Sequence, residues 1–298
     1  MLAAPQIDAF LPPRRILMGP GPSDVHPQVL AAQARPTVGH LDPLFIGMMD
    51  ELKQLLQYAF QTKNEMTLAV SAPGSAGMET CFVNLVEPGE KVIVCRNGVF
   101  GERMRQNVER VGAIAVLVDN EWGTPVDPAA VEAALKANPD AKFLAFVHAE
   151  TSTGALSDAK TLCALAKQYG CLSIVDAVTS LGGVELRVDE WGIDAIYSGS
   201  QKCLSCVPGL SPVSFSSAAV EKLKNRKEEE VMGWGSLYLP KDPVRERQLP
   251  IRPRKQVTSE NVLGHLQDDH APNPDNPSIS LETLVVFAAN TSKHVLDI

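Results

Sequence analysis

The chain has 298 residues, 45% of them hydrophobic, so it can bury one large core or two modest ones. Its formal net charge of −8 argues against a nucleic-acid partner, because phosphate backbones are bound by clustered Lys and Arg. No stretch approaches the ~20 consecutive apolar residues of a membrane span, and Met1 to Phe10 lacks the pattern of a secretory signal. We expect a globular cytoplasmic protein that acts on small molecules.

An N-terminal arm, residues 1–40, is predicted to precede the main domain. The first strong periodic signal follows it, and apolar residues there recur with the i, i+3, i+4, i+7 spacing of an amphipathic helix. These residues are Phe45, Met48, Met49, Leu52, Leu55 and Leu56. The main domain is expected to cover residues 41–225.

Between residues 67 and 215, short β-type runs alternate with stretches of helical spacing. This alternation predicts an α/β domain with a mostly parallel seven-stranded sheet and flanking helices. The continuous apolar character of the runs indicates strands buried on both faces. The predicted strands are 67–71, 91–95, 113–118, 142–147, 172–176, 194–198 and 211–215, and the predicted helices between them are 99–111, 127–137 and 158–169.

The character of the chain changes after about residue 225. A charge cluster covers 226–230, and seven prolines between Pro240 and Pro277 interrupt any long element. Only 279–289 regains apolar density. We expect residues 226–298 to form an atypical, partly irregular C-terminal tail.

The six cysteines are scattered through apolar segments and are expected to be reduced core thiols. Cys203 and Cys206 have the spacing of a redox pair or of half a zinc site. A zinc site needs a second pair of ligands, and none has suitable spacing. No metal site is predicted.

Two charged side chains stand at predicted strand ends. Asp176 ends one strand, and Lys202 follows the next in the run Ser-Gly-Ser-Gln-Lys. Ligands of open α/β sheets bind outside the carboxyl ends of strands. A carboxylate and an amine placed there suit pyridoxal 5′-phosphate (PLP), which forms an imine with a lysine and needs an acid beside its pyridine nitrogen. The alternative interpretation is that Asp176 is a turn residue at a strand end and Lys202 is a surface lysine.

A turn of small residues, 71–77, lies between a predicted strand and a helical segment. Such a turn at a helix start offers unpaired N–H groups to a phosphate, although it is equally typical of an ordinary βα turn. Neither GxGxxG nor GxxxxGK[ST] is present, so NAD and ATP are disfavoured.

Five blocks in order resemble the alanine–glyoxylate, serine–glyoxylate and ureidoglycine–glyoxylate group of class V aminotransferases. They are Gly19-Pro-Gly-Pro22, Phe60-Gln-Thr-Lys-Asn64, Glu150-Thr-Ser-Thr-Gly154, Val175-Asp-Ala-Val-Thr-Ser-Leu-Gly182 and Tyr197-Ser-Gly-Ser-Gln-Lys202. The resemblance implies the PLP-dependent transferase fold (fold type I) and a homodimer. It also implies a ping-pong reaction that transfers an amino group from a small amino acid, such as alanine, serine or ureidoglycine, to a 2-oxo acid, glyoxylate.

The resemblance also implies two catalytic residues. Lys202 would form the imine and move protons between substrate and cofactor, and Asp176 would pair with the pyridinium nitrogen. The resemblance assigns the remaining cofactor-binding residues either to the ring or to the phosphate of PLP. Phe100 and Val178 would contact the faces of the ring, and Thr151 would donate a hydrogen bond to its phenolic oxygen.

The phosphate is assigned by the same resemblance to Gly74, Ser75 and Gln201. The block at Gly19 and the side chain of His40 resemble the segment that lines the substrate entrance. Pro73 stands where many relatives carry Ser or Thr, which removes one hydroxyl and one N–H donor.

The C-terminal small domain of the family is expected to be truncated or atypical here. It supplies an Arg that clamps the substrate carboxylate, and Arg245, Arg247, Arg252 and Arg254 are not assigned that role. One alternative is therefore a weak or silent member that retains cofactor binding or assembly. Another is a cysteine desulfurase, which would be expected to carry a cysteine late in the chain, whereas the last one here is Cys206.

Overall fold

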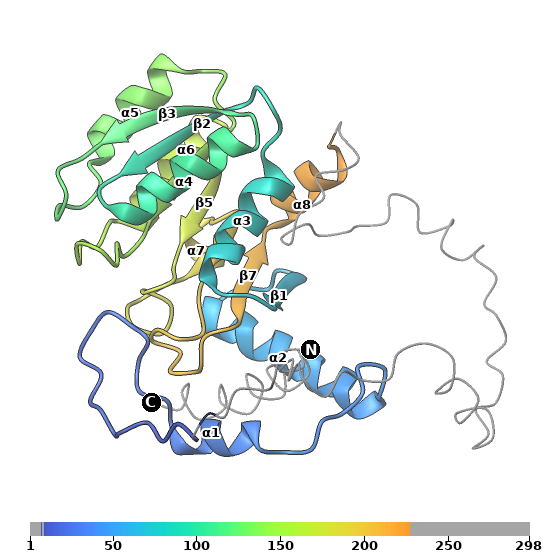
Figure 1. Cartoon of the computed structure of the whole chain (residues 1–298). Helices are drawn as coiled ribbons and strands as arrows, with labels where there is room; N and C mark the ends of the chain where they lie inside the picture. The colour runs from blue at the N-terminus through green and yellow to red at the C-terminus, as the bar shows by residue number, and fades with distance from the viewer. Residues whose placement is uncertain (1–6, 8, 227–298) are drawn as a thin grey trace, which may run out of the picture.

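The computed structural model describes residue 7 and residues 9–226, which build a seven-stranded sheet with helices on both faces (Figure 1). The strand order is β1-β7-β6-β5-β4-β2-β3. Strand β7 (Ser211–Phe215) runs antiparallel to both of its neighbours, and the other pairs are parallel. The predicted mostly parallel α/β sheet is confirmed, with one reversed strand.

All seven predicted strands are present, and their observed ends lie within two residues of the predicted ones. Strand β4 is buried at every position, as its unbroken apolar sequence requires. The edge strand β3 is mostly exposed or half-buried. Besides β7, the strands of the sheet are β1 (Met66–Val70), β2 (Lys91–Arg96), β3 (Ile114–Asp119), β4 (Phe143–Val147), β5 (Leu172–Asp176) and β6 (Ala195–Tyr197).

The predicted helices are also found, and three short ones are added. The helices are α1 (Pro27–Gln33), α2 (Pro43–Phe60), α3 (Gly74–Leu85), α4 (Val99–Arg110), α5 (Pro128–Ala137), α6 (Ala159–Gln168), α7 (Val188–Trp191) and α8 (Ser217–Lys224). The sequence analysis missed α1, α7 and α8, whose 7, 4 and 8 residues are too few for a clear periodic pattern.

Side-chain caps explain where several helices begin. The carboxylate of Asp127 accepts a hydrogen bond from the N–H of Ala129 at 2.9 Å, and Pro128 occupies the first turn of α5. Asp42 and Pro43 start α2 in the same way, with 2.8 Å from Asp42 Oδ1 to the N–H of Leu44. Each such cap stabilises its helix by about 1 kcal/mol.

The core consists of two apolar layers, one on each face of the sheet. Alternate residues of a strand enter different layers: Ile93 belongs to the layer that contains residues of α2, α5, α6 and α7, whereas Val92 belongs to the layer that contains residues of α3, α4 and α8. Figure 1 shows these helices flanking the sheet. Because the sheet is covered on both faces, its strand ends are where polar chemistry can be placed.

Five of the six cysteines are buried, and Cys203 is half-buried. All six are free thiols, as the sequence analysis predicted. Among the described residues, no helix is both long and apolar enough to cross a membrane. The four arginines from Arg245 to Arg254 and the apolar stretch 279–289 lie outside the described residues.

Candidate cofactor site

The predicted site residues lie at or after the carboxyl ends of β1, β2, β4, β5 and β6, which all point to the same edge of the sheet. Asp176 is the last residue of β5, and Lys202 lies in the loop between β6 and β7. Backbone hydrogen bonds hold that loop, among them those from Ser198 N to Pro212 O at 2.8 Å and from Ser200 N to Leu210 O at 3.0 Å. Lys202 is therefore presented by a fixed turn rather than by a strand.

Asp176 is 2% exposed and carries two hydrogen bonds. Its Oδ1 accepts from the N–H of Val178 at 2.8 Å, and its Oδ2 accepts from the hydroxyl of Tyr197 at 2.8 Å. Burial raises the pKa of Asp176 to about 6, and both hydrogen bonds oppose that rise. A cationic partner would favour the charged form further.

Lys202 is half-buried beneath the N-terminal segment. Its Nζ donates to the carbonyl oxygen of Pro20 at 2.9 Å, and the hydroxyl of Ser23 donates to the carbonyl oxygen of Lys202 at 2.8 Å. Figure 1 shows the blue N-terminal segment near the loop that leads into β7. Gly21 has φ +126°, and a Cβ there would lie 2.6 Å from Lys202 Nζ. A side chain at Gly21 would be strained at this φ and would displace the end of the Lys202 side chain.

The small-residue turn offers the predicted phosphate site. Gly74 and Ser75 open α3, Pro73 gives no side-chain cap, and among the described residues neither N–H has an acceptor. A Cβ on Gly74 would lie 3.2 Å from Val178 Cγ2, so the turn packs against the end of β5. Within the part of the chain that the structure describes, Gln201 Oε1 is also buried without a partner. Unpaired N–H donors fit a phosphate, and a flip of the Gln201 amide would put its NH₂ donor in the place of this oxygen.

Phe100 lies at the start of α4, where a buried carboxylate fixes the backbone. Glu150 is 0% exposed, and its Oε2 accepts from the N–H groups of Phe100 at 3.2 Å and Gly101 at 3.3 Å. Its Oε1 accepts from the hydroxyl of Ser152 at 2.6 Å. The carboxylate satisfies donors at the helix start and places Phe100 at the site.

Thr151 follows Glu150 and contacts a second threonine. Its Oγ1 lies 3.1 Å from Thr179 Oγ1, and the Thr179 hydroxyl donates to Ala149 O at 2.6 Å. A hydroxyl has one proton, so Thr151 is the donor of the pair. To donate to a ligand, as predicted, the Thr151 hydroxyl must first break its hydrogen bond to Thr179 Oγ1.

Arg103 brings a positive charge to the same place. Its Nη1 donates to Ser75 Oγ at 3.1 Å, and its guanidinium lies 5.1 Å from the centre of the Phe100 ring. Its charge also lowers the pKa of Asp176. Anionic ligands are favoured near Arg103 and Ser75.

The sequence analysis missed the roles of Tyr197, Glu150, Thr179 and Arg103. Tyr197 and Glu150 stand within the quoted blocks, and a Glu three residues after a fully apolar strand was the available signal for a buried carboxylate. His40, assigned to the entrance, is exposed.

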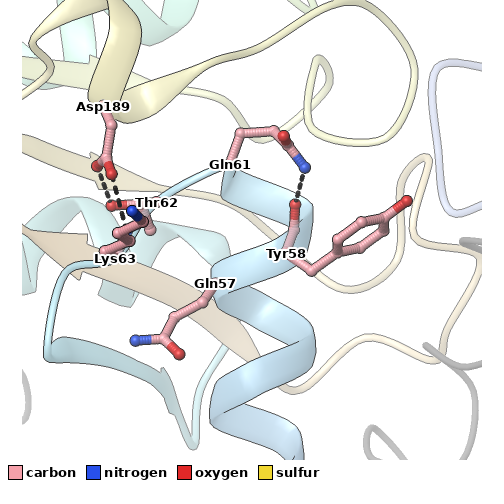
Figure 2. Close-up of a pocket in the computed structure, with 6 residues that line it drawn as sticks. All are labelled: Gln57, Tyr58, Gln61, Thr62, Lys63 and Asp189. Atoms are coloured by element: carbon pink, nitrogen blue, oxygen red, sulfur yellow. Dashed lines mark hydrogen bonds between the residues drawn. The ribbon is translucent and has the colours of Figure 1, made fainter.

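A cavity of about 300 Å³ opens elsewhere, at the end of α2 (Figure 2). Asp189 points at Thr62 and Lys63, and its two oxygens accept from Thr62 Oγ1 at 2.5 Å and Lys63 N at 2.9 Å, while Tyr58 turns away. These polar groups satisfy one another, and none of the predicted site residues lines this cavity.

Solved structures place this fold among known ones. An alanine–glyoxylate aminotransferase from Nostoc sp. is 38% identical with a TM-score of 0.79, and the match covers 97% of this chain and 69% of that protein. A ureidoglycine–glyoxylate aminotransferase from Bacillus subtilis is 30% identical with a TM-score of 0.80, and the match covers 97% of this chain and 68% of that protein. The fold is that of the PLP-dependent aminotransferases.

The family model for class V aminotransferases matches residues 25–229. The alanine–glyoxylate aminotransferase of Rattus norvegicus is 42% identical over 219 residues, which is 74% of this chain and 53% of the relative. This chain belongs to the class V aminotransferase family. It spans about half the length of the curated relatives it matches.

Proposed function

We propose that this chain binds PLP through Lys202 and Asp176 and carries out transamination from a small amino acid to glyoxylate. The observation that carries the proposal is the meeting, at one edge of the sheet, of a buried carboxylate, a lysine in a fixed turn and a helix start with unpaired N–H groups. Each suits a different part of PLP: the pyridine nitrogen, the aldehyde carbon and the phosphate.

Bound PLP supplies an electron sink for the carbon that loses its proton. Asp176, as a carboxylate, holds a proton on the pyridine nitrogen. Phe100 and Val178 would confine the ring, Thr151 would donate to its phenolic oxygen, and Gly74, Ser75 and Gln201 would hold the phosphate. Lys202 Nζ would take and return the proton of the substrate.

The substrate assignment rests on similarity. The relatives named above are an alanine–glyoxylate and a ureidoglycine–glyoxylate aminotransferase. Both names share glyoxylate, so we propose glyoxylate as the acceptor and alanine, serine or ureidoglycine as the donor. The competing proposal is cofactor binding or assembly without turnover, and the activity assays below decide between the two.

We further propose that the chain forms a homodimer through its N-terminal part. Large apolar side chains are exposed there, which is unusual for a free surface. They include Ile7, Phe10, Leu11, Ile16, Met18, Leu30, Leu41 and Leu44. Light scattering tests this assignment: a dimer mass is expected, and a shift toward monomer is expected when Phe10, Leu11 and Ile16 are replaced by serine.

A reducing compartment, the cytoplasm, suits the six free thiols.

Coupled assays of the full chain with glyoxylate and each donor test the reaction. Turnover with alanine, serine or ureidoglycine that disappears in Lys202→Ala supports the proposal. Cofactor binding without turnover for any donor overturns transamination and favours the silent alternative. Lys142→Ala, at an exposed lysine outside the site, is the matched control and should leave turnover unchanged.

A further inference from the structure

Asp176 and Tyr197 are direct neighbours in the sheet. They are paired residues of the parallel strands β5 and β6, and the Tyr197 hydroxyl donates to Asp176 Oδ2 at 2.8 Å. Tyr197 is 0% exposed. Its ring belongs to the apolar layer beneath α3, so the hydroxyl has no access to solvent.

We propose that Tyr197 is a positioning residue for Asp176, fixing Oδ2 and holding this carboxyl in the charged form that a protonated pyridine nitrogen requires. The inference rests on the proposed function, because Asp176 is assigned to the cofactor there. Val178 N–H fixes the other oxygen at 2.8 Å. With both oxygens held, the carboxylate has one orientation.

The groups around Asp176 make the Tyr197 hydroxyl a donor at every working pH. Burial is the main cause that raises the pKa of Tyr197 well above 10, so its proton stays in place. Burial likewise raises the pKa of the Cys81 thiol on α3, which remains neutral. Of the charged neighbours, Glu150 raises and Arg103 lowers the pKa of Asp176. Tyr197 and Val178 N–H are thus the uncharged donors that oppose burial.

The test measures binding of pyridoxamine 5′-phosphate to the full chain by equilibrium dialysis. This probe carries the ring and phosphate of PLP without the aldehyde, so Lys202 attachment does not contribute. Tyr197→Phe keeps the ring and removes the hydroxyl. Tyr169→Phe is the matched control, because its hydroxyl also donates to a carboxylate, Glu132, at 2.9 Å and lies outside the site.

Loss of a hydrogen bond to a charged carboxylate raises its pKa by about one pH unit or more. At about pH 6, Tyr197→Phe should therefore bind the probe about fivefold more weakly than wild type, because more of its Asp176 is protonated. At about pH 8.5 Asp176 is ionised in both proteins, so the two affinities should nearly agree. Tyr169→Phe should match wild type at both pH values.

Four outcomes are decisive. An unchanged affinity in Tyr197→Phe, or an equal loss at both pH values, overturns the positioning role while the proposed function stands. Absence of probe binding by wild type overturns the proposed function itself. In the Asp176→Asn background, Tyr197→Phe should add no pH-dependent loss, and a remaining one contradicts action through Asp176.

A second measurement covers the case in which Tyr197→Phe does not fold. The four tyrosines of the chain are labelled with 3-fluorotyrosine and followed by ¹⁹F NMR against pH. One resonance should titrate near the pKa of Asp176, about 6, and stop titrating in Asp176→Asn. If all four resonances are unaffected by Asp176→Asn, the coupling is refuted.

Discussion

The two ends of the candidate site are built differently. The pyridine end, formed by Asp176, Tyr197 and the Val178 N–H, lies within and directly after neighbouring strands, and its carboxyl and phenol are almost fully buried. The amine end, formed by Lys202, Pro20, Gly21 and Ser23, joins two loops and is half-buried or exposed.

The difference between the two ends suits two different tasks, control of protonation at the pyridine end and attachment of the cofactor at the amine end. The pyridine end must keep one protonation state, so a rigid, dry environment with two donors suits it. In the proposed function, Lys202 must leave Pro20 before it can react, so a loop contact with a single hydrogen bond from its Nζ suits that role. Perturbing the first should affect charge and affinity, and perturbing the second should affect the rate of attachment.

Asp176→Asn should have the largest effect at the pyridine end. Removing one partner of a buried ion pair costs about 3–5 kcal/mol, so PLP affinity should fall about a hundredfold or more. Equilibrium dialysis at neutral pH checks this result. An affinity within threefold of wild type would show that Asp176 does not meet the ring.

The same substitution should stabilise the chain without cofactor. The folded-state pKa of Asp176, about 6, lies above its ordinary value of 3.8, so wild-type stability decreases as the pH rises from about 4 to 6. Above that window Asp176→Asn, which does not titrate, should be more stable than wild type by up to about 3 kcal/mol. Urea unfolding at about pH 5 and about pH 8 checks the sign, and a gain no larger at pH 8 than at pH 5 would contradict it.

Gly21→Ala should act at the amine end. The added Cβ is strained at φ +126° and would lie 2.6 Å from Lys202 Nζ, so Lys202 must shift. Strain of about 1–3 kcal/mol should slow the attachment of PLP to Lys202 roughly tenfold. The affinity for pyridoxamine 5′-phosphate should change little, because this probe does not attach to Lys202. Stopped-flow absorbance measures the rate. Gly19→Ala is the matched control, since nothing lies within 4 Å of its added Cβ, and equal rates in the two variants would refute the contact.

Thr179→Val should have the smallest effect, at the turn beside the ring. It removes the hydroxyl that donates to Ala149 O and accepts from Thr151. A loss of about 1 kcal/mol in unfolding free energy is expected, with PLP affinity weakened by less than about fivefold. Thr153→Val is the control, because its hydroxyl makes only a 3.5 Å contact with Asn97 O. A larger loss in Thr153→Val than in Thr179→Val would contradict the assignment.

Asp176 and Lys202 were both predicted from sequence, but the residues that contact each of them were not. Asp176 closes a strand that burial on both faces makes easy to recognise, and its place at the sheet edge follows from that. Its pairing with Tyr197 depends on strand register, which no local pattern gives. The contact of Gly21 with Lys202 joins residues far apart in sequence, and the reversed direction of β7 likewise depends on tertiary packing.

Borohydride reduction of the full chain with PLP, followed by peptide mass spectrometry, tests the central claim most directly. The attachment of PLP should be found on the peptide that contains Lys202, with no label there in Lys202→Ala. Label on a different lysine, or on none, would contradict the assignment of this edge of the sheet to the cofactor.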